Sequence, residues 1–285
     1  MAFHVKHRRH PDWLKVRIPA GATYNLIRTT LKENKVNTVC EEAKCPNIAE
    51  CYGRGTATFL IMGDVCTRVC LYCNIRSGVP KSLDRQEPHK IADTVNRLNL
   101  NYAVITSVTR DDLPDYGAEH FYNTVAEIRK LRPECKVEIL TPEFKGNIRL
   151  LERVLDSSPY IFNHNIETVR NLFPHVRPEG SYERSLNVLE HAGNCLPNIK
   201  SGLMIGLGET IDQIRETLHD LRRAGVTILT IGQYLQPGTG LSEVKKYYTI
   251  QEFNKLKEDA FDMGFTHVFS GPLVRSSYHA EEVLS

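Results

Sequence analysis

The sequence predicts an α/β fold in which six parallel β/α units form a partial (β/α)6 barrel. Short runs rich in β-branched and other apolar residues alternate with longer segments in which apolar residues recur every three or four positions. This alternation is typical of parallel β/α units. The chain has 285 residues, 41% of them hydrophobic, which is enough for one large core. Six units leave such a barrel open, whereas eight would close it.

The expected strands begin at residue 58 and are separated by expected helices. The strands are residues 58–62, 103–107, 136–140, 160–163, 200–205 and 227–231. The helices are residues 87–100, 118–131, 182–192 and 210–224. In a β/α barrel the loops after the strands gather at one end, so polar residues just beyond the strands mark the first place to look for a site.

Six of the eight cysteines form two triplets on either side of the first expected strand. The spacings are C-x4-C-x5-C and C-x3-C-x2-C, and the members are Cys40, Cys45, Cys51, Cys66, Cys70 and Cys73. An iron-sulfur cube held by three thiolates keeps one iron free for a ligand other than cysteine, whereas cysteine pairs would indicate tetrahedral zinc. The two triplets therefore predict two clusters, each with an open iron.

Zinc knuckles and disulfides are the alternative roles for the second triplet. No C-x2-C pair with a second pair or a His-x3-His partner follows it, which argues against zinc. The first residues lack the apolar stretch of a secretory signal, and disulfides need an oxidising compartment. Cys135 and Cys195 lie in expected helix-to-strand connections away from both triplets, and we interpret them as bystanders.

The second triplet, with the aromatic Tyr72 just before its last cysteine, resembles the signature of the radical S-adenosylmethionine (SAM) enzymes. The resemblance implies a barrel of the radical SAM type, in which these three cysteines hold a [4Fe-4S] cluster and the free iron is chelated by SAM. Tyr72 would then pack near the adenine. Reduction of the cluster cleaves SAM, and the 5'-deoxyadenosyl radical abstracts hydrogen from an unreactive carbon.

Polar residues follow most of the expected strands. Asn163, Glu167 and Lys200 are candidates for contacting SAM because of their place at strand tips and the usual polar character of such sites. The aspartates at 111–112 could equally cap helices or pair with the preceding arginine. The run at 202–209 resembles the G-x-I-x-G-x-x-E motif of radical SAM barrels. We interpret it as mainly architectural, because its glycines can shape a tight turn.

The first triplet and the terminal run R-S-S-Y at 275–278 narrow the resemblance to the lipoyl synthase family. In that family the first triplet holds an auxiliary [4Fe-4S] cluster, which the second serine of R-S-S-Y completes. The match spans roughly residues 36 to 280 and implies that Ser277 is the fourth ligand. Serine oxygen is a harder donor than thiolate, so this bond to iron should be easier to lose. Without the resemblance, a turn hydroxyl would be the preferred role, and Ser276 is the nearby alternative ligand.

The resemblance also implies the reaction. Two sulfur atoms are inserted at C6 and C8 of an octanoyl chain that is amide-linked to a lysine of a carrier protein, and the product is a lipoyl group. Each sulfur requires one hydrogen abstraction, so two SAM molecules are used for each lipoyl group. The auxiliary cluster supplies the sulfur and is consumed. Arg275 could orient the substrate amide or stabilise the serine loop, and a surface salt bridge is the alternative.

This chemistry requires the two ends of the chain to meet over the barrel mouth. We expect residues 1–51 to form an amino-terminal extension, residues 52–268 the core barrel, and residues 269–285 a tail that carries the serine. Both extensions would act as lids that keep water from a radical. Tyr278 and His279 could line the channel or simply pack.

The implied partners are octanoylated lipoyl domains of 2-oxoacid dehydrogenase complexes and the glycine-cleavage H protein. An electron donor such as ferredoxin or flavodoxin and an iron-sulfur carrier are also implied. The net charge of +2 is too small for general nucleic-acid binding, although the basic arm at residues 4–10 could dock an acidic lipoyl domain. No apolar run is long enough for a membrane span. We expect a cytoplasmic monomer.

Two competing functions differ in what the sequence should contain. Another radical SAM enzyme, such as a biotin-synthase-like sulfur inserter or a methylthiotransferase, would keep the second triplet but not the first triplet with R-S-S-Y. An iron-sulfur scaffold or electron carrier would not need a barrel mouth large enough for SAM, and its clusters are usually ligated by cysteine throughout.

Overall fold

Seven parallel strands form the centre of the molecule. The computed structural model describes residues 11, 20–278, 280 and 282. The strand order in the main sheet is β1-β2-β5-β6-β7-β8-β9-β10, and every neighbouring pair from β2 to β10 is parallel. These strands are β2 (Thr58–Ile61), β5 (Tyr102–Ser107), β6 (Lys136–Leu140), β7 (Ile161–Asn163), β8 (Ile199–Ile205), β9 (Ile228–Gln233) and β10 (His267–Gly271). The short β1 (Asn37–Thr38) pairs antiparallel with β2. The chain is therefore an open parallel barrel of the predicted α/β class.

All six expected strands are present, and β10 adds a seventh that the sequence analysis did not predict. It follows α10 (Ile250–Asp262) and pairs with β9, as a further β/α unit would. Only Val268 of this edge strand is fully buried, so the strand lacks a continuous apolar run. Its residues 269–271 fall within the segment that we assigned to the tail.

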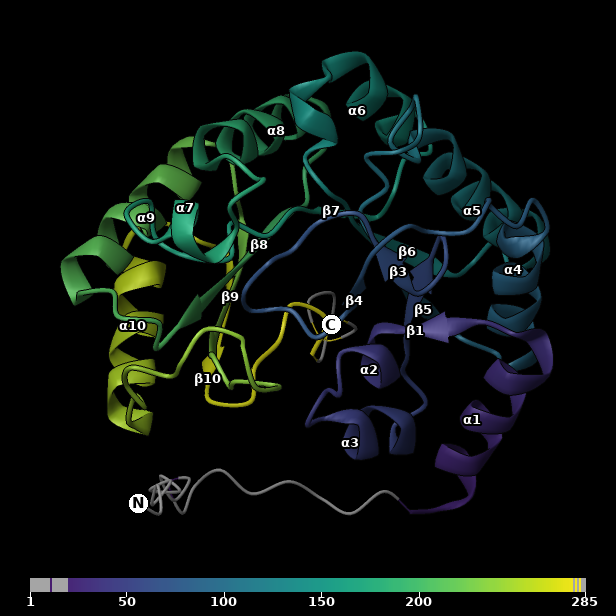
Figure 1. The fold of residues 1–285 in the computed structure, drawn as a ribbon, viewed down its shortest axis with the longest axis horizontal. Helices are drawn as coiled ribbons and strands as arrows, with labels where there is room; N and C mark the ends of the chain where they lie inside the picture. The colour runs from purple at the N-terminus through teal and green to yellow at the C-terminus, as the bar shows by residue number, and fades with distance from the viewer. Residues whose placement is uncertain (1–10, 12–19, 279, 281, 283–285) are drawn as a thin grey trace, which may run out of the picture.

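The helices form an arc outside the strands (Figure 1). In chain order the arc consists of α1 (Ala22–Asn34), α4 (Glu87–Arg97), α5 (Ala118–Leu131), α6 (Ile148–Leu155), α8 (Tyr182–Cys195), α9 (Ile211–Arg223) and α10. The four expected helices are α4, α5, α8 and α9. Capping boxes at Thr210 and Thr249 fix the starts of α9 and α10, because each threonine and the third helical residue satisfy each other's backbone amides.

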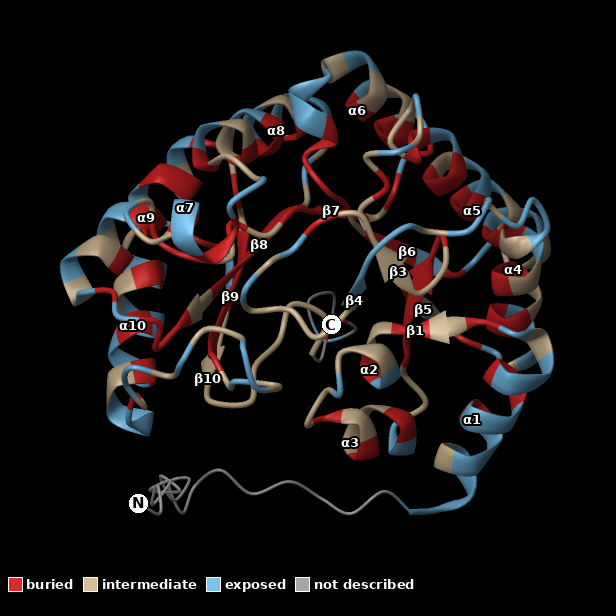
Figure 2. Ribbon diagram, in the orientation of Figure 1, coloured by how far each residue is buried: buried red, intermediate tan, exposed pale blue. Residues whose placement is uncertain are grey.

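The core lies between this arc and the sheet, where the strands are buried along most of their length (Figure 2). Every residue of β2 and β9 is buried. Strands covered on both faces read as nearly continuous apolar runs, which is why the sequence showed them clearly. None of the helices in the described parts of the chain is long and apolar enough to cross a membrane.

A buried ion pair lies inside the barrel. Glu138 on β6 and Lys200 on β8 are at most 1% exposed, and the lysine Nζ lies 3.0 Å from both carboxylate oxygens. The Tyr102 hydroxyl donates to the same carboxylate at 2.7 Å, and the Asn163 amide donates at 2.8 Å. Four donor contacts to one carboxylate compensate for its loss of water. This cluster forms the floor of the barrel, and Glu138 at its centre lies two residues before the end of β6.

Short segments from both ends of the chain meet at the open side of the arc. The helices α2 (Val39–Glu42) and α3 (Ile48–Gly53) carry Cys40 and Cys51, with Cys45 in the turn between them, and lie beside the carboxyl-terminal segment in Figure 1. The Asn47 amide donates to the Leu273 carbonyl at 2.6 Å, and the Tyr278 hydroxyl donates to Glu50 at 3.0 Å. Arg54 pairs with Glu282 at 2.8 Å. Contacts across more than 200 residues thus join the two segments.

Candidate active site

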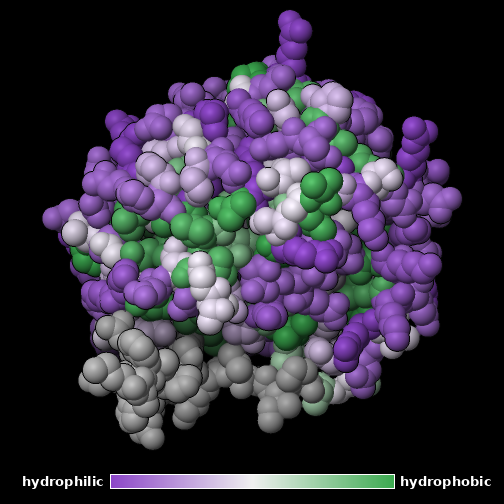
Figure 3. Space-filling view, in the orientation of Figure 1, coloured by the Kyte–Doolittle hydropathy of each residue, from purple (hydrophilic) through white to green (hydrophobic). Residues whose placement is uncertain are grey.

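A cavity of about 620 Å3 opens at the carboxyl ends of the barrel strands. The first cysteine triplet, part of the second and the serine tail all contribute to its wall. The lining residues from these segments include Cys40, Cys45, Cys51, Tyr72, Cys73, Arg275, Ser276 and Ser277. On the face shown in Figure 3, hydrophilic residues cover most of the periphery and apolar residues gather toward the middle. One cavity therefore brings both triplets and the tail together, although they are far apart in sequence.

Ser277 lies at the first triplet. The Thr58 hydroxyl on β2 donates to Ser277 Oγ at 2.8 Å, and the same threonine also hydrogen-bonds to Cys40. Arg275 is close enough to Cys45 for its charge to favour the thiolate. Two members of the predicted ligand set, Cys40 and Ser277, thus meet at a single threonine on the first barrel strand.

The buried thiols fit a metal cluster better than they fit free cysteines. Burial raises the pKa of Cys40 and of Cys70 to about 12, and that of Cys73 to about 11. Burial also raises the pKa of Cys45. Neighbouring cysteines in each triplet raise the pKa of Cys40, Cys70 and Cys73 further, because thiolates repel one another. Bound iron would remove this penalty, since it requires the deprotonated thiol.

The thiols in the described part of the chain do not converge on one point. Within residues 20–278, no three histidine, cysteine or acidic side chains are close enough together to hold one metal ion. A [4Fe-4S] cube is instead held by thiolates that bind different irons, so its ligands surround the cube without converging on one point.

The loop that carries the second triplet is held by its neighbours on both sides. Thr67 binds the Thr109 carbonyl through its amide, and the Leu71 amide donates to the Val176 carbonyl at 2.9 Å. The amide of Arg68 donates to Cys66 Sγ at 3.4 Å. Such amide contacts to sulfur stabilise a thiolate. The loop is therefore fixed independently of any ligand.

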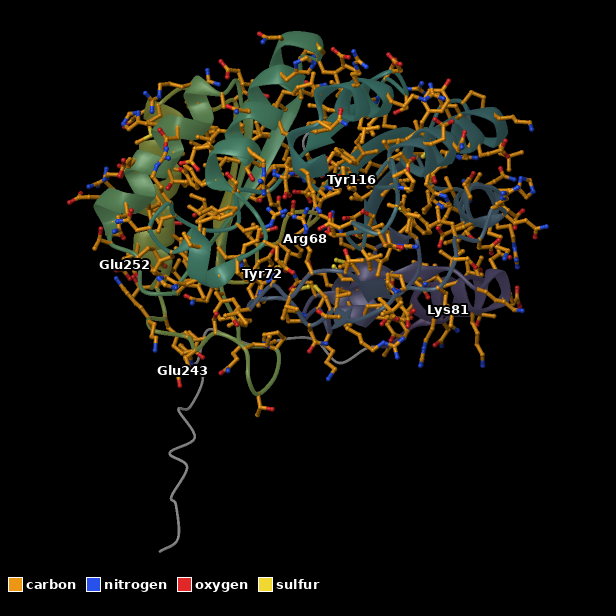
Figure 4. All side chains as sticks on the ribbon, turned by 45° about the horizontal axis from the view of Figure 1, so that its top comes forward. Arg68, Tyr72, Lys81, Tyr116, Glu243 and Glu252 are labelled. Atoms are coloured by element: carbon orange, nitrogen blue, oxygen red, sulfur yellow. The ribbon has the colours of Figure 1, made fainter. Side chains whose placement is uncertain are left out.

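Arg68 joins this loop to a buried charge network that sequence reasoning missed. Its guanidinium binds Asp111 in bidentate fashion at 2.8 and 3.0 Å and contacts Glu143 at 2.5 Å. Arg177 binds the other oxygen of Glu143 at 2.7 Å. Both arginines are nearly buried, and their charge lowers the pKa of Glu143 to about 2 despite its burial. Figure 4 shows Arg68 and Tyr72 near the middle of the molecule, away from the exposed Lys81 and Glu243.

The aspartates at 111–112 take the structural role that we left open. Asp112 binds Arg110 at 2.8 and 2.7 Å, as expected of the neighbouring pair, and Asp111 binds Arg68. Glu209 of the glycine motif accepts the amides of Gly206 and Leu207 at 2.6 and 2.9 Å. This glutamate closes the turn, in agreement with the architectural interpretation.

Of the three candidate SAM contacts, only Glu167 lines the cavity. Its φ of 68° is unusual for a residue other than glycine, and its backbone bonds to Gly202 and Met204 hold it there. Tyr72 and Asn165 hydrogen-bond to its carboxyl group, whose pKa is raised by burial. Strain of this kind is retained where the surrounding structure and the function demand it.

Asn163 and Lys200 are not among the lining residues, because both bind Glu138 on the barrel floor. A role for them as SAM contacts stays a prediction, and the geometry gives them a structural role. Ser107, at the end of β5, lines the cavity with a buried hydroxyl that has no partner in the described parts of the chain. A polar ligand would satisfy this hydroxyl. No motif in the sequence distinguishes this serine from others.

The remaining candidates lie as follows. Arg275 donates to the Val274 carbonyl of its own loop at 2.7 Å, which agrees with a role in stabilising that loop. Tyr278 lines the cavity, and His279 lies outside the described residues. Cys135 is buried and Cys195 is exposed, and neither contributes to the cavity wall.

His164 predicts a pH dependence of stability near this site. It is 1% exposed, its Nδ1 lies 2.8 Å from the Thr141 carbonyl, and its Nε2 has no partner in the described structure. Burial, and then the charge of Arg177, lower its pKa from 6.5 to about 4. Because only the unfolded chain takes up this proton between those values, stability falls as the pH drops from about 6.5 to about 4. We expect a loss of roughly 1–3 kcal/mol.

Urea unfolding of the cluster-free chain at pH 7 and pH 5 measures this loss. The control is His164→Asn, whose amide can still reach the Thr141 carbonyl but does not titrate. Equal pH dependence in both proteins would show that other groups cause the loss.

Comparison with known proteins places the chain in a family. Residues 60–221 match the model of the radical SAM superfamily, and residues 3–45 match that of the N-terminal domain of lipoyl synthase of the radical SAM family. Two solved structures share the fold at 14% identity. HydG, a maturase of the [FeFe]-hydrogenase, has a TM-score of 0.58 over 87% of this chain and 67% of its own. Methylornithine synthase has a TM-score of 0.54 over 93% of this chain and 89% of its own.

Curated relatives are much more similar in sequence. A lipoyl synthase from Rubrobacter xylanophilus is 51% identical over 99% of this chain and 89% of its own length. A lipoyl synthase from Halalkalibacterium halodurans is 51% identical over 99% of this chain and 94% of its own. Identity at this level over nearly the whole length, together with both family models, confirms the resemblance that the cysteine triplets suggested. The chain belongs to the lipoyl synthase family of the radical SAM superfamily.

Proposed function

We propose that this chain inserts two sulfur atoms at C6 and C8 of an octanoyl group on a carrier-protein lysine, which converts it to a lipoyl group. The observation that carries the proposal is the single cavity lined by the first cysteine triplet, by Tyr72 and Cys73 of the second, and by Ser277. Sulfur transfer to an unactivated carbon requires the sulfur source and the hydrogen-abstracting group to reach the same carbon. A common cavity provides that proximity.

Cys66, Cys70 and Cys73 are the residues that would hold the SAM-binding [4Fe-4S] cluster. When bound there, SAM supplies the 5'-deoxyadenosyl radical that takes hydrogen from C6 or C8, once for each sulfur. Tyr72 would pack beside the adenine, because it already lies against Val176, Leu207 and Tyr234. Glu167 and the unpartnered hydroxyl of Ser107, which both line the cavity, are the groups that would orient SAM.

Cys40, Cys45, Cys51 and Ser277 would hold the auxiliary cluster, which is the sulfur donor and thus a substrate. Iron bound to a serine oxygen exchanges its ligand more readily than iron bound to thiolate. The Thr58 hydroxyl, which lies 2.8 Å from Ser277 Oγ, would stabilise this side chain when it is not bound to iron. The protein therefore holds the donor with three strong ligands and one weak one.

The two terminal segments would exclude water from the reaction. Two hydrogen bonds join the lids, one from Asn47 to Leu273 and one from Tyr278 to Glu50. Each of these two hydrogen bonds contributes only modestly to stability, so the amino-terminal segment can move away from the tail for a protein-bound substrate. We infer that the octanoyl-lysine enters between them.

The proposed reaction implies specific protein partners. Octanoylated lipoyl domains of 2-oxoacid dehydrogenase complexes and the glycine-cleavage H protein are the proposed carriers, and ferredoxin or flavodoxin the electron donor. An iron-sulfur carrier would rebuild the consumed cluster. We infer that the chain works as a cytoplasmic monomer. The basic arm at residues 4–10, proposed to dock the carrier, lies outside the described residues.

An anaerobic assay tests this function. The reconstituted chain receives reductant, SAM and an octanoyl-lysyl peptide, and peptide mass is followed together with 5'-deoxyadenosine. We expect a peptide with two added sulfurs, about one per chain, and about two deoxyadenosines for each product. Deoxyadenosine without any sulfur-bearing peptide would refute the proposed substrate while leaving the family assignment intact.

A further inference from the structure

Two strand glycines leave space at the place where the tail is bound: Gly232 makes room for the tail itself, and Gly202 makes room for Asn165, which binds the tail. A Cβ on Gly232 of β9 would lie 2.1 Å from the Val274 carbonyl oxygen, which is impossible without moving the tail. A Cβ on Gly202 of β8 would lie 2.7 Å from Asn165 Oδ1, the atom that receives the Ser276 hydroxyl. Neither glycine has a positive φ, so close approach and not backbone conformation requires glycine here.

The barrel floor determines how Ser276 is bound. Glu138 can only accept hydrogen bonds, so the Asn163 group 2.8 Å from it must be the amide nitrogen. The second hydrogen of this nitrogen points to Ser276 Oγ, also at 2.8 Å. Ser276 therefore accepts from Asn163 and must donate elsewhere, and it donates to Asn165 Oδ1 at 2.9 Å. The orientation of this hydroxyl follows from a buried ion pair in the middle of the barrel.

The two serines of the tail point to opposite sides of the barrel. Ser276 contacts Asn163 at the end of β7, whereas Ser277 contacts Thr58 on β2. In the sheet, β5 and β6 lie between these two strands. A tail held on the β7 side by Ser276 has little freedom to move Ser277 away from the first triplet.

The same contacts connect the tail with the SAM side of the cavity. Asn165 binds Ser276 through its oxygen and also hydrogen-bonds to Glu167, which Tyr72 binds from the second-triplet loop. The four side chains thus form a continuous chain of hydrogen bonds from the serine tail to the residue beside the second triplet.

We propose that Ser276 is a positioning residue that, with the socket formed by Gly202 and Gly232, seats the tail so that Ser277 faces the first cysteine triplet. The role of Ser277 as a cluster ligand rests on the proposed function. The seating of the tail does not, because the contacts that seat it are all within the protein. Ser276 binds the barrel, and Ser277 is the ligand of the auxiliary cluster. The proposal thereby also selects between the two serines as ligand.

Hydrogen exchange of the tail amides at residues 273–278 tests the seating, in the cluster-free chain and in the reconstituted chain. Ser276→Ala removes both side-chain hydrogen bonds, and we expect the tail amides of the cluster-free chain to exchange about tenfold faster. Gly232→Ala removes no hydrogen bond but displaces the Val274 carbonyl, and it should increase the same exchange. Gly238→Ala is the matched control, because its Cβ would lie 3.6 Å from its nearest neighbour, an ordinary contact.

The reconstituted variants supply the second measurement. We expect Ser276→Ala and Gly232→Ala to lose first-triplet iron to a chelator about tenfold faster than the parent, with second-triplet iron retained. Unaltered exchange in both variants, with thermal unfolding as in the control, would overturn the proposal. Faster exchange with normal retention of first-triplet iron would overturn the link between seating and cluster. Neither result bears on the proposed function, which the peptide assay and a Ser277→Ala variant test separately.

Discussion

Replacing Cys70 with alanine is expected to abolish SAM cleavage, with 5'-deoxyadenosine falling more than about 100-fold, because the cofactor carries out this step and the protein only holds it. Cys70 is half-buried in a loop fixed by backbone bonds, so the loop keeps its shape when the thiol is lost. The first triplet is held by α2 and α3 and should keep its cluster. Iron per chain should fall from about eight to about four.

Chromatography of deoxyadenosine and an iron assay measure both effects. Cys195→Ala serves as the control, since this exposed cysteine does not line the cavity. Undiminished SAM cleavage in the Cys70 variant would show that the second triplet is not the SAM site.

Replacing Cys45 with alanine is expected to have the opposite effect. SAM cleavage should persist within about threefold of the parent, because the second triplet and its loop are untouched, whereas sulfur insertion should fall more than about 100-fold. Cys45 lies next to Arg275 in the cavity wall. The substitution therefore removes a thiol at the point where the first triplet meets the tail. The reaction would stop after hydrogen abstraction for lack of a sulfur donor.

Parallel assays of deoxyadenosine and of peptide mass distinguish the two steps. Sulfur-bearing peptide formed by the Cys45 variant at the parent rate would mean that the first triplet is not the sulfur source. Together the two variants show which triplet is needed for SAM cleavage and which for sulfur insertion, and Cys195→Ala is the control for both.

Local patterns in the sequence predicted the strands that are buried on both faces. Residues 58–61 and 228–233 are buried throughout and read as apolar runs. In β10, by contrast, only Val268 is fully buried, and the strand is defined by pairing with β9. Periodicity cannot reveal a strand whose stabilisation comes from its neighbour and not from its own burial.

The cysteine triplets were also predictable, because their spacing alone constrains the chemistry. The groups around them were not. Arg68 and Glu143 are 75 positions apart, and their pairing depends on loops that meet only in the folded barrel. Asn163 ends β7 as expected, whereas Lys200 lies near the start of β8 and not at its tip. Both side chains point to Glu138, because a buried carboxylate requires several donors.

The sulfur source is tested most directly by isotope labelling. The chain is reconstituted anaerobically with heavy-isotope sulfide, transferred to buffer free of sulfide, and allowed to react once with SAM, reductant and octanoyl-lysyl peptide. If the cluster on Cys40, Cys45, Cys51 and Ser277 is consumed as donor, both sulfurs of the lipoyl product carry the heavy isotope, and first-triplet iron is released. A product that carries sulfur of natural abundance while the cluster stays intact would contradict the account.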